Sequence, residues 1–198
     1  RGLGDVYKRQ GVYMSQFKIH TIETAPEDSK ELLKGAEKQL GFIPNLYGIM
    51  AEAPAALKAY NGLSQNFENS SFNATETQIV LLSTSFVNEC HYCMAVHSTV
   101  GQMQKIDEGI IEALRTGEPI KDEKLEALRK FTQTVVERRG WLEENDIEEF
   151  LSAGYNKAQL LEVIVGVVQK TLSNYINHIV QTPLDAAFEP NKWEKVQV

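Results

Sequence analysis

The chain has 198 residues, of which 42% are hydrophobic and 24% charged, and its formal net charge is −7. This is the composition of a globular domain, and the acidic balance argues against a surface for nucleic acid or anionic membranes, which needs a basic stripe. No apolar run approaches the roughly 20 residues of a membrane span, because the longest, Leu160 to Val168, is interrupted by Glu162 and Gly166. Two cysteines are too few for a disulfide scaffold, and no secretory signal is evident, so we expect a reducing, cytoplasmic location.

Residues 1–13 look foreign to the domain. The string DVYKRQ resembles the translation of a transposon end used in preparing sequencing libraries, read through into an open frame. We therefore expect the natural start at Met14 and exclude the leader from the fold. The alternative is a genuine leader, and neither alternative bears on function.

Helix signals recur from one end of the chain to the other. Apolar residues repeat at three- and four-residue spacing, and capping residues such as Asp122 and Asn156 separate the repeats. The helices expected in chain order cover 26–40, 46–50, 54–67, 75–88, 90–105, 107–114, 122–139, 146–153 and 157–181. No segment alternates with period two, so the chain is predicted to be all-α, an antiparallel bundle of about seven to nine helices. We expect a single domain over 14–187 and a C-terminal tail over 188–198.

Two cysteines and a histidine share one helical stripe. Cys90, Cys93 and His97 are spaced i, i+3 and i+7, and the imidazole of His97 can reach the sulfur one turn before it. The attacking species in thiol chemistry is the thiolate, which the positive end of a helix and a neighbouring base or imidazolium both favour. Cys90 is then placed to resolve a sulfenic acid on Cys93 as a disulfide.

Three other interpretations compete with a redox site. A zinc site could take Cys90, Cys93 and His97 as ligands, but the sequence has no second CxxC or HxxxH to complete a structural site, and His91 lies off the stripe. A thioredoxin-type CxxC requires a preceding strand, whereas the segment before Cys90 is predicted to be helical. The third interpretation is a pair of buried cysteines and a core histidine that share a face by chance. We expect no metal and no cofactor.

The segment 75–98, TETQIVLLSTSFVNECHYCMAVHS, is similar to the carboxymuconolactone decarboxylase superfamily. Within it, the segment most resembles the alkylhydroperoxidase D-like (AhpD-like) branch, in which a helix ending in Asn precedes CxxC and a His follows four residues after the second cysteine. Residues 41–54 (GFIPNLYGIMAEAP), 113–131 (ALRTGEPIKDEKLEALRKF) and 174–185 (NYINHIVQTPLD) extend the similarity to most of the chain. The resemblance implies an AhpD-like helical bundle that forms a homo-oligomer, a trimer or a multiple of one.

The resemblance also implies roles for individual residues. Cys93 would be the peroxidatic sulfur, Cys90 the more exposed resolving cysteine, and His97 part of a proton relay. In the family a carboxylate completes that relay twelve residues before the first cysteine, and here that position is Gln78. Glutamine can orient the histidine or hold a water, but it cannot take up a proton. Glu76 is close in sequence but points to another side of the helix.

Other departures from the family pattern surround the motif. Glu89 stands where the family often has glycine, so Asn88 is expected to supply the left-handed turn, and a carboxylate at Glu89 would raise the pKa of Cys90. Tyr92 stands where some members carry histidine. On the last long helix, three polar residues are expected either to line the site or to form a surface or inter-subunit face: Asn174, Asn177 and His178.

These observations predict a thiol-dependent peroxidase that reduces organic hydroperoxides. Because no flavin, haem or nucleotide signature is present, the electrons would come from an external dithiol or a protein reductant, and no nucleic-acid or membrane partner is expected. Two alternatives stay open: a carboxymuconolactone decarboxylase-like enzyme, which would not need CxxC, and a non-catalytic helical scaffold whose dithiol senses redox state.

Overall fold

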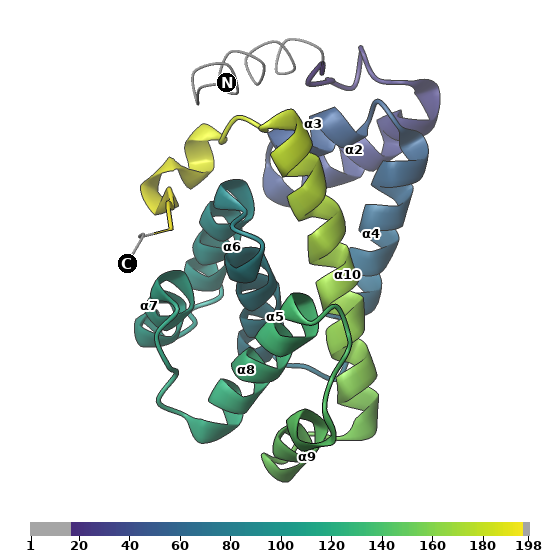
Figure 1. Cartoon of the computed structure of the whole chain (residues 1–198). Helices are drawn as coiled ribbons and strands as arrows, with labels where there is room; N and C mark the ends of the chain where they lie inside the picture. The colour runs from purple at the N-terminus through teal and green to yellow at the C-terminus, as the bar shows by residue number, and fades with distance from the viewer. Residues whose placement is uncertain (1–16, 196–198) are drawn as a thin grey trace, which may run out of the picture.

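The computed structural model describes residues 17–195, and this part of the chain folds into nine α-helices and one 3₁₀-helix without a strand (Figure 1). The prediction of an all-α chain is confirmed, and the leader expected over 1–13 lies outside the described residues. The elements are α2 (Glu27–Leu40), α3 (Asn45–Met50), α4 (Pro54–Glu68), α5 (Ala74–Val87), α6 (His91–Met103), α7 (Glu108–Thr116), α8 (Glu123–Glu137), α9 (Glu144–Ser152), α10 (Lys157–Val180) and η1 (Ala186–Asn191).

Several of the helices begin where the sequence supplies a capping side chain. The Asn73 side chain accepts a hydrogen bond from the backbone N–H of Glu76, and the Glu76 carboxylate accepts one from the backbone N–H of Asn73. Asn156 and Gln159 begin α10 in the same way. Asp107 and Asp122 cap α7 and α8 with their carboxylates. These local hydrogen bonds explain why the predicted helix starts agree with the structure to within one or two residues at most positions.

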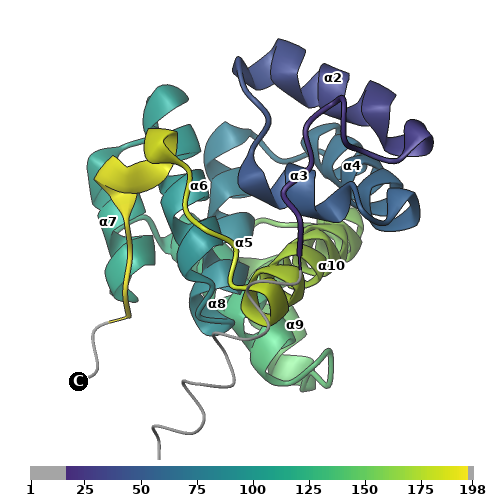
Figure 2. The ribbon, with the colours of Figure 1, turned by 90° about the horizontal axis from the view of Figure 1, so that it is seen from above.

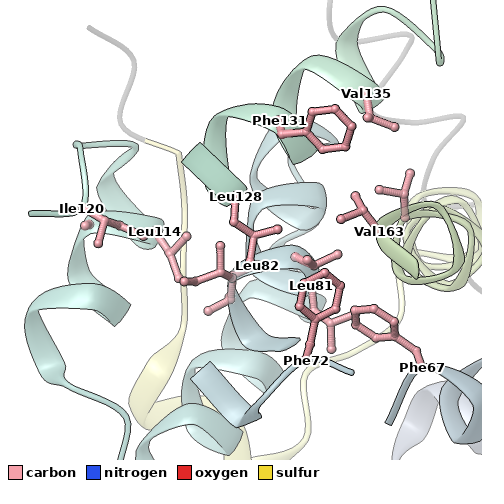
Figure 3. Close-up of a cluster of buried hydrophobic side chains, with 14 of the residues drawn as sticks. Phe67, Phe72, Leu81, Leu82, Leu114, Ile120, Leu128, Phe131, Val135 and Val163 are labelled. Carbon is pink, nitrogen blue, oxygen red and sulfur yellow. The ribbon is translucent and has the colours of Figure 1, made fainter. Parts of the chain in front are cut away.

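Helix α5 is the centre of the bundle. Its residues from Gln78 to Ser85 are all buried, because α8, α10, α6 and α7 pack around it. Figure 3 shows Leu81 and Leu82 of α5 in one apolar cluster with Leu128 of α8 and Val163 of α10. A helix enclosed on every side can hold its polar side chains in fixed positions, and this makes α5 a support for buried polar groups.

Helix α10 approaches α4 and α5 closely at Gly166. A methyl group at this position would lie 2.7 Å from the Phe67 ring and 2.7 Å from a Val80 methyl group. The missing side chain therefore allows the long helix to lie against both neighbours. Further along α10, the same close approach brings Lys170 to His97 in the middle of α6, and Ser173 and Asn177 to the cysteines at its start.

The C-terminal segment returns across α6 (Figure 2). Phe188 and Trp193 are buried, the Trp193 indole N–H donates to the backbone oxygen of Arg115 at 2.7 Å, and the Arg115 guanidinium donates to the backbone oxygen of Asn191 at 3.1 Å. The described part of the expected tail, 188–195, thus packs on α6 and α7. Among the helices of residues 17–195, none combines the length and apolar character that a membrane span requires.

Candidate thiol site

The two cysteines lie at the turn from α5 to α6. Asn88, the C-cap residue of α5, keeps a right-handed backbone conformation with φ −76°, and Glu89 takes the left-handed conformation with φ 55°. The expectation that Asn88 supplies the left-handed residue is therefore wrong, since the position preferred by glycine is occupied by glutamate itself. The Glu89 side chain is exposed and pairs with Lys195 at 2.9 Å, so it points away from the sulfurs.

Cys90 is the N-cap residue of α6, and its sulfur accepts a hydrogen bond from the backbone N–H of Cys93 at 3.4 Å. Both thiols are free and buried, with exposed fractions of 0% for Cys90 and 1% for Cys93. The expectation that Cys90 is the more exposed cysteine is therefore wrong. The physical reason is the packing of α10, which covers both sulfurs.

One face of α10 supplies the polar surroundings of the sulfurs. The amide nitrogen of Asn177 donates to Cys93 at 3.3 Å and to Cys90 at 3.6 Å, and the Ser173 hydroxyl lies 3.7 Å from the Cys93 sulfur. Asn174 is fully buried beside them, and its carbonyl oxygen accepts from the side chain of Asn88 at 3.0 Å. His178, one residue beyond Asn177, is on the exposed side of the helix.

His97 is held between two buried polar groups from different helices. Its Nδ1 lies 3.0 Å from the amide oxygen of Gln78, and its Nε2 lies 2.8 Å from the ammonium nitrogen of Lys170. An ammonium group only donates, so Nε2 accepts and Nδ1–H donates to Gln78. Gln78 therefore fixes the tautomer, while Glu76 caps α5 and pairs with Lys124 at 3.6 Å, away from the imidazole.

Lys170 is the main site residue that the sequence interpretation missed. It is 1% exposed, and no carboxylate of residues 17–195 forms an ion pair with it. A signal was present in the sequence, because Lys170 lies seven residues after Val163 and four before Asn174, on the stripe of α10 that faces the core. A lysine on an apolar stripe is rarely buried without an anionic or polar partner.

The charge and hydrogen bonds around the cysteines separate their pKa values. Burial alone would raise the pKa of Cys93, but a hydrogen bond from Cys90, the charge of Lys170 and hydrogen bonds from Ser173 and Asn174 hold it well below its usual range. The hydrogen bond to Cys93, together with burial, raises the pKa of Cys90 instead. The pair therefore favours a Cys93 thiolate beside a Cys90 thiol.

Burial and the nearby charge of Lys170 lower the pKa of His97. This imidazole is therefore neutral, and the positive charge beside Cys93 belongs to Lys170. The sequence left open whether His97 is a neutral base or an imidazolium, and its lowered pKa favours the neutral base.

Tyr92, between the two cysteines, anchors the start of α6 to neighbouring segments. Its hydroxyl donates to Asp185 at 2.6 Å, and the same carboxylate accepts from the backbone N–H of Asn45 at 3.0 Å. These hydrogen bonds join α6, the segment after α10 and the start of α3. Burial and the neighbouring carboxylate raise the pKa of Tyr92, so its hydroxyl stays protonated.

Two tyrosines border the thiols on the side of α3 and α4. Tyr60 is buried in the same apolar cluster as both cysteines, and Tyr47 meets its ring edge-on at a centroid distance of 5.7 Å. Burial and the negative charge of Cys93 raise the pKa of Tyr60. In the described part of the chain, no three His, Cys, Asp or Glu side chains are grouped as metal ligands would be.

Comparison with solved structures defines the fold. The chain superposes on an alkylhydroperoxidase AhpD core protein, a peroxidase-related protein from Ralstonia eutropha JMP134, with a TM-score of 0.79 and 16% identity. The superposition covers 87% of this chain and 93% of the other. A peroxidase-related protein from Silicibacter sp. TM1040 superposes with a TM-score of 0.74 and 17% identity, over 87% of this chain and 94% of the other. The debrominase Bmp8 superposes with a TM-score of 0.71 and 17% identity, over 83% of this chain and 90% of the other. The fold is therefore AhpD-like, as the sequence resemblance implied.

The sequence itself matches no family model and no curated protein. The similarity to the solved structures thus defines the fold, and the chemistry has to be argued from the residues of this chain.

Proposed function

We propose that this protein is a thiol-dependent peroxidase that reduces organic hydroperoxides. The observation that carries the proposal is the polar environment of the two buried thiols, because the Asn177 amide donates to both sulfurs and the buried Lys170 lies on the same face of α10. This environment favours a Cys93 thiolate beside a protonated Cys90. The Cys93 thiolate attacks the terminal oxygen of the hydroperoxide, the O–O bond breaks, and the products are a sulfenic acid and an alkoxide that leaves as the alcohol.

The second step uses the neighbouring thiol. Cys90 attacks the sulfenic sulfur, a disulfide forms, and the hydroxyl group leaves as water with the proton of Cys90. The N-cap position places Cys90 against the backbone of Cys93, so only a small local movement is needed to join the sulfurs. An external dithiol or protein reductant then reduces the disulfide, which suits the reducing cytoplasm that we infer for the protein.

Halogenated aromatic compounds are a second candidate class of substrate. A debrominase shares the fold, and a variant of it has been solved in complex with 2,3,4-tribromopyrrole. In this chain, Tyr47 and Tyr60 form an aromatic wall beside the thiols, a surface suited to a planar ring. Reductive removal of a halide would oxidise the same dithiol to a disulfide, replace carbon–bromine by carbon–hydrogen and release bromide.

The proposal predicts that the wild-type protein consumes cumene hydroperoxide in the presence of dithiothreitol, and that the double variant Cys90→Ser/Cys93→Ser consumes it no faster than buffer. The physical reason is that both electrons come from the dithiol. Peroxide loss is followed colorimetrically, and bromide release from a bromopyrrole is measured in parallel. Equal rates for the wild type and the double variant would contradict the peroxidase proposal, and a wild type that only forms the disulfide would favour the redox-sensing scaffold.

We also infer that the chain self-associates through the outer face of α10. Apolar side chains repeat there at alternating spacings of four and three residues, the pattern of a helix that packs on another helix. They are Leu161, Val165, Val168, Leu172, Tyr175 and Ile179. Ile179 is 67% exposed, yet between Leu161 and Ile179 the helix has only two charged residues, Glu162 and Lys170, and Lys170 is buried. A second copy fits this face because the spacing is the same when the helix is reversed.

The double variant Leu161→Glu/Ile179→Glu, which introduces two negative charges on this face, should therefore reduce the assembly to monomers, whereas Met103→Glu should not. Met103 is 76% exposed on a different helix, so it controls for the effect of adding a carboxylate to the surface. Light scattering after size exclusion measures the mass, and a trimer or a multiple of one is the state implied by the family resemblance. A monomeric wild type would overturn the inference.

A further inference from the structure

Cleavage of a hydroperoxide requires a proton as well as a thiolate, because the departing alkoxide is a strong base. This requirement rests on the proposed peroxidase function. Gln78 occupies the position where the relay carboxylate was expected, and an amide has no proton to give at neutral pH. The source of the proton must therefore be found elsewhere in the site.

His97 cannot be that source in the arrangement observed. Its one proton is on Nδ1 and is donated to Gln78, while Nε2 accepts from Lys170. Burial and the charge of Lys170 also keep the imidazole neutral by lowering its pKa. Both nitrogens are thus engaged, and neither presents a proton to a substrate at Cys93.

Lys170 has both the position and the free donors. It is on the α10 face that also carries Ser173 and Asn177, which contact the Cys93 sulfur. An ammonium group has three N–H donors, and among residues 17–195 only His97 Nε2 accepts one of them. A buried ammonium requires a compensating anion, and no carboxylate of residues 17–195 pairs with Lys170, whereas its charge acts on the sulfur of Cys93.

We propose that Lys170 is a catalytic residue that stabilises the Cys93 thiolate and donates the proton to the departing alkoxide. The sulfur–oxygen bond forms as the O–O bond breaks, and the alkoxide takes a proton from the ammonium, leaving alcohol, sulfenic acid and a neutral amine. When the external dithiol later reduces the disulfide, it supplies two protons. Cys90 takes one, and Lys170 takes the other while Cys93 returns to its thiolate.

Alkylation of Cys93 by iodoacetamide tests the stabilisation of the thiolate separately from proton donation, because the iodide that leaves needs no proton. Removing the positive charge should raise the pKa of Cys93, so the pH midpoint of alkylation should move upward in Lys170→Gln and stay near the wild-type value in Lys170→Arg. Glutamine and arginine can both still donate to His97 Nε2, so the fold does not depend on one drastic substitution. Lys157→Gln, at the exposed start of α10, is the matched control and should change nothing.

Proton donation is tested by comparing two peroxides, one whose leaving group needs a proton and one whose leaving group does not. Each peroxide rate is divided by the alkylation rate at the same pH, which removes the effect of the thiolate fraction. This ratio should fall by about 100-fold or more with cumene hydroperoxide in both Lys170→Gln and Lys170→Arg, and by less than about 10-fold with peroxybenzoic acid, whose carboxylate leaves unprotonated. Adding Gln78→Glu to Lys170→Gln should raise the ratio for cumene hydroperoxide at least about 10-fold above that of Lys170→Gln alone, because a carboxylate beside Nδ1 allows His97 to carry the proton.

Equal losses for the two peroxides, or no loss for either, would overturn the role of Lys170 as a proton donor. An unchanged alkylation midpoint in Lys170→Gln would overturn its role in stabilising the thiolate. A wild-type protein whose Cys93 is alkylated at low pH but reacts with neither peroxide would instead refute the proposed peroxidase function, and the proton-donor role with it. Circular dichroism of each variant confirms that the helical fold is retained.

Discussion

The Cys90→Ser variant should stop after one reaction with hydroperoxide and retain a sulfenic acid on Cys93, whereas the Cys93→Ser variant should form none. Cys93 has the stabilised thiolate, surrounded by the donors of Asn177 and Ser173 and the charge of Lys170. Cys90 is fully buried and has a raised pKa, so it remains a thiol that cannot begin the reaction. Loss of the nucleophile should lower the peroxide rate on the order of 1,000-fold or more.

Dimedone labelling followed by mass spectrometry of the peptide that contains both positions measures the result. The wild type, which closes the disulfide, should label weakly and should give the mass of an intramolecular disulfide after one equivalent of peroxide. His91→Ala is the matched control, because His91 is on α6 but binds the backbone of Trp193 at 2.9 Å instead of the sulfurs. A dimedone adduct on Cys90 in the Cys93→Ser variant would show that the roles of the two cysteines have been exchanged.

Phe150→Ala should lower the free energy of unfolding by about 3–5 kcal/mol. The Phe150 ring is fully buried and stacks between Phe131, at a centroid distance of 4.2 Å, and Tyr155, at 4.7 Å. It attaches α9 to α8, so its removal leaves a cavity between two helices in addition to the lost apolar burial. Urea unfolding followed by circular dichroism at 222 nm, the far-ultraviolet band of helices, measures the change.

Trp141→Ala is the control for this prediction. Trp141 is 84% exposed, so its removal should change the free energy of unfolding by less than about 0.5 kcal/mol. Phe150 belongs to a different apolar cluster from the cysteines, and alkylation of Cys93 in the folded variant should therefore keep its wild-type pH midpoint. A loss below about 1 kcal/mol for Phe150→Ala would mean that the stack contributes little beyond surface burial.

The all-helical fold and the position of the thiol motif could be predicted because their causes are local. Capping side chains such as Asn73 and Asn156 bond to the backbone within three residues, and apolar periodicity is a property of one helix at a time. The spacing of Cys90, Cys93 and His97 is local for the same reason.

The properties that decide the chemistry were settled by contacts between distant segments. Sequence alone decided neither the burial of Cys90 nor the left-handed conformation of Glu89, because both follow from how the turn after α5 meets the rest of the bundle. The Asn177 side chain reaches the cysteines across 84 and 87 residues of sequence.

Lys170 illustrates the difference most clearly. In the sequence it is one lysine in a helix, and only its place on the apolar stripe suggested that it could be buried. The tertiary structure brings its ammonium to His97 across 73 residues of sequence, with no carboxylate of residues 17–195 to neutralise it. The sequence by itself determined a helical dithiol with a histidine one turn away. Only the packing of α10 against α5 and α6 decided that the charge beside the thiolate belongs to lysine, because a pKa depends on the groups that the fold places around a side chain.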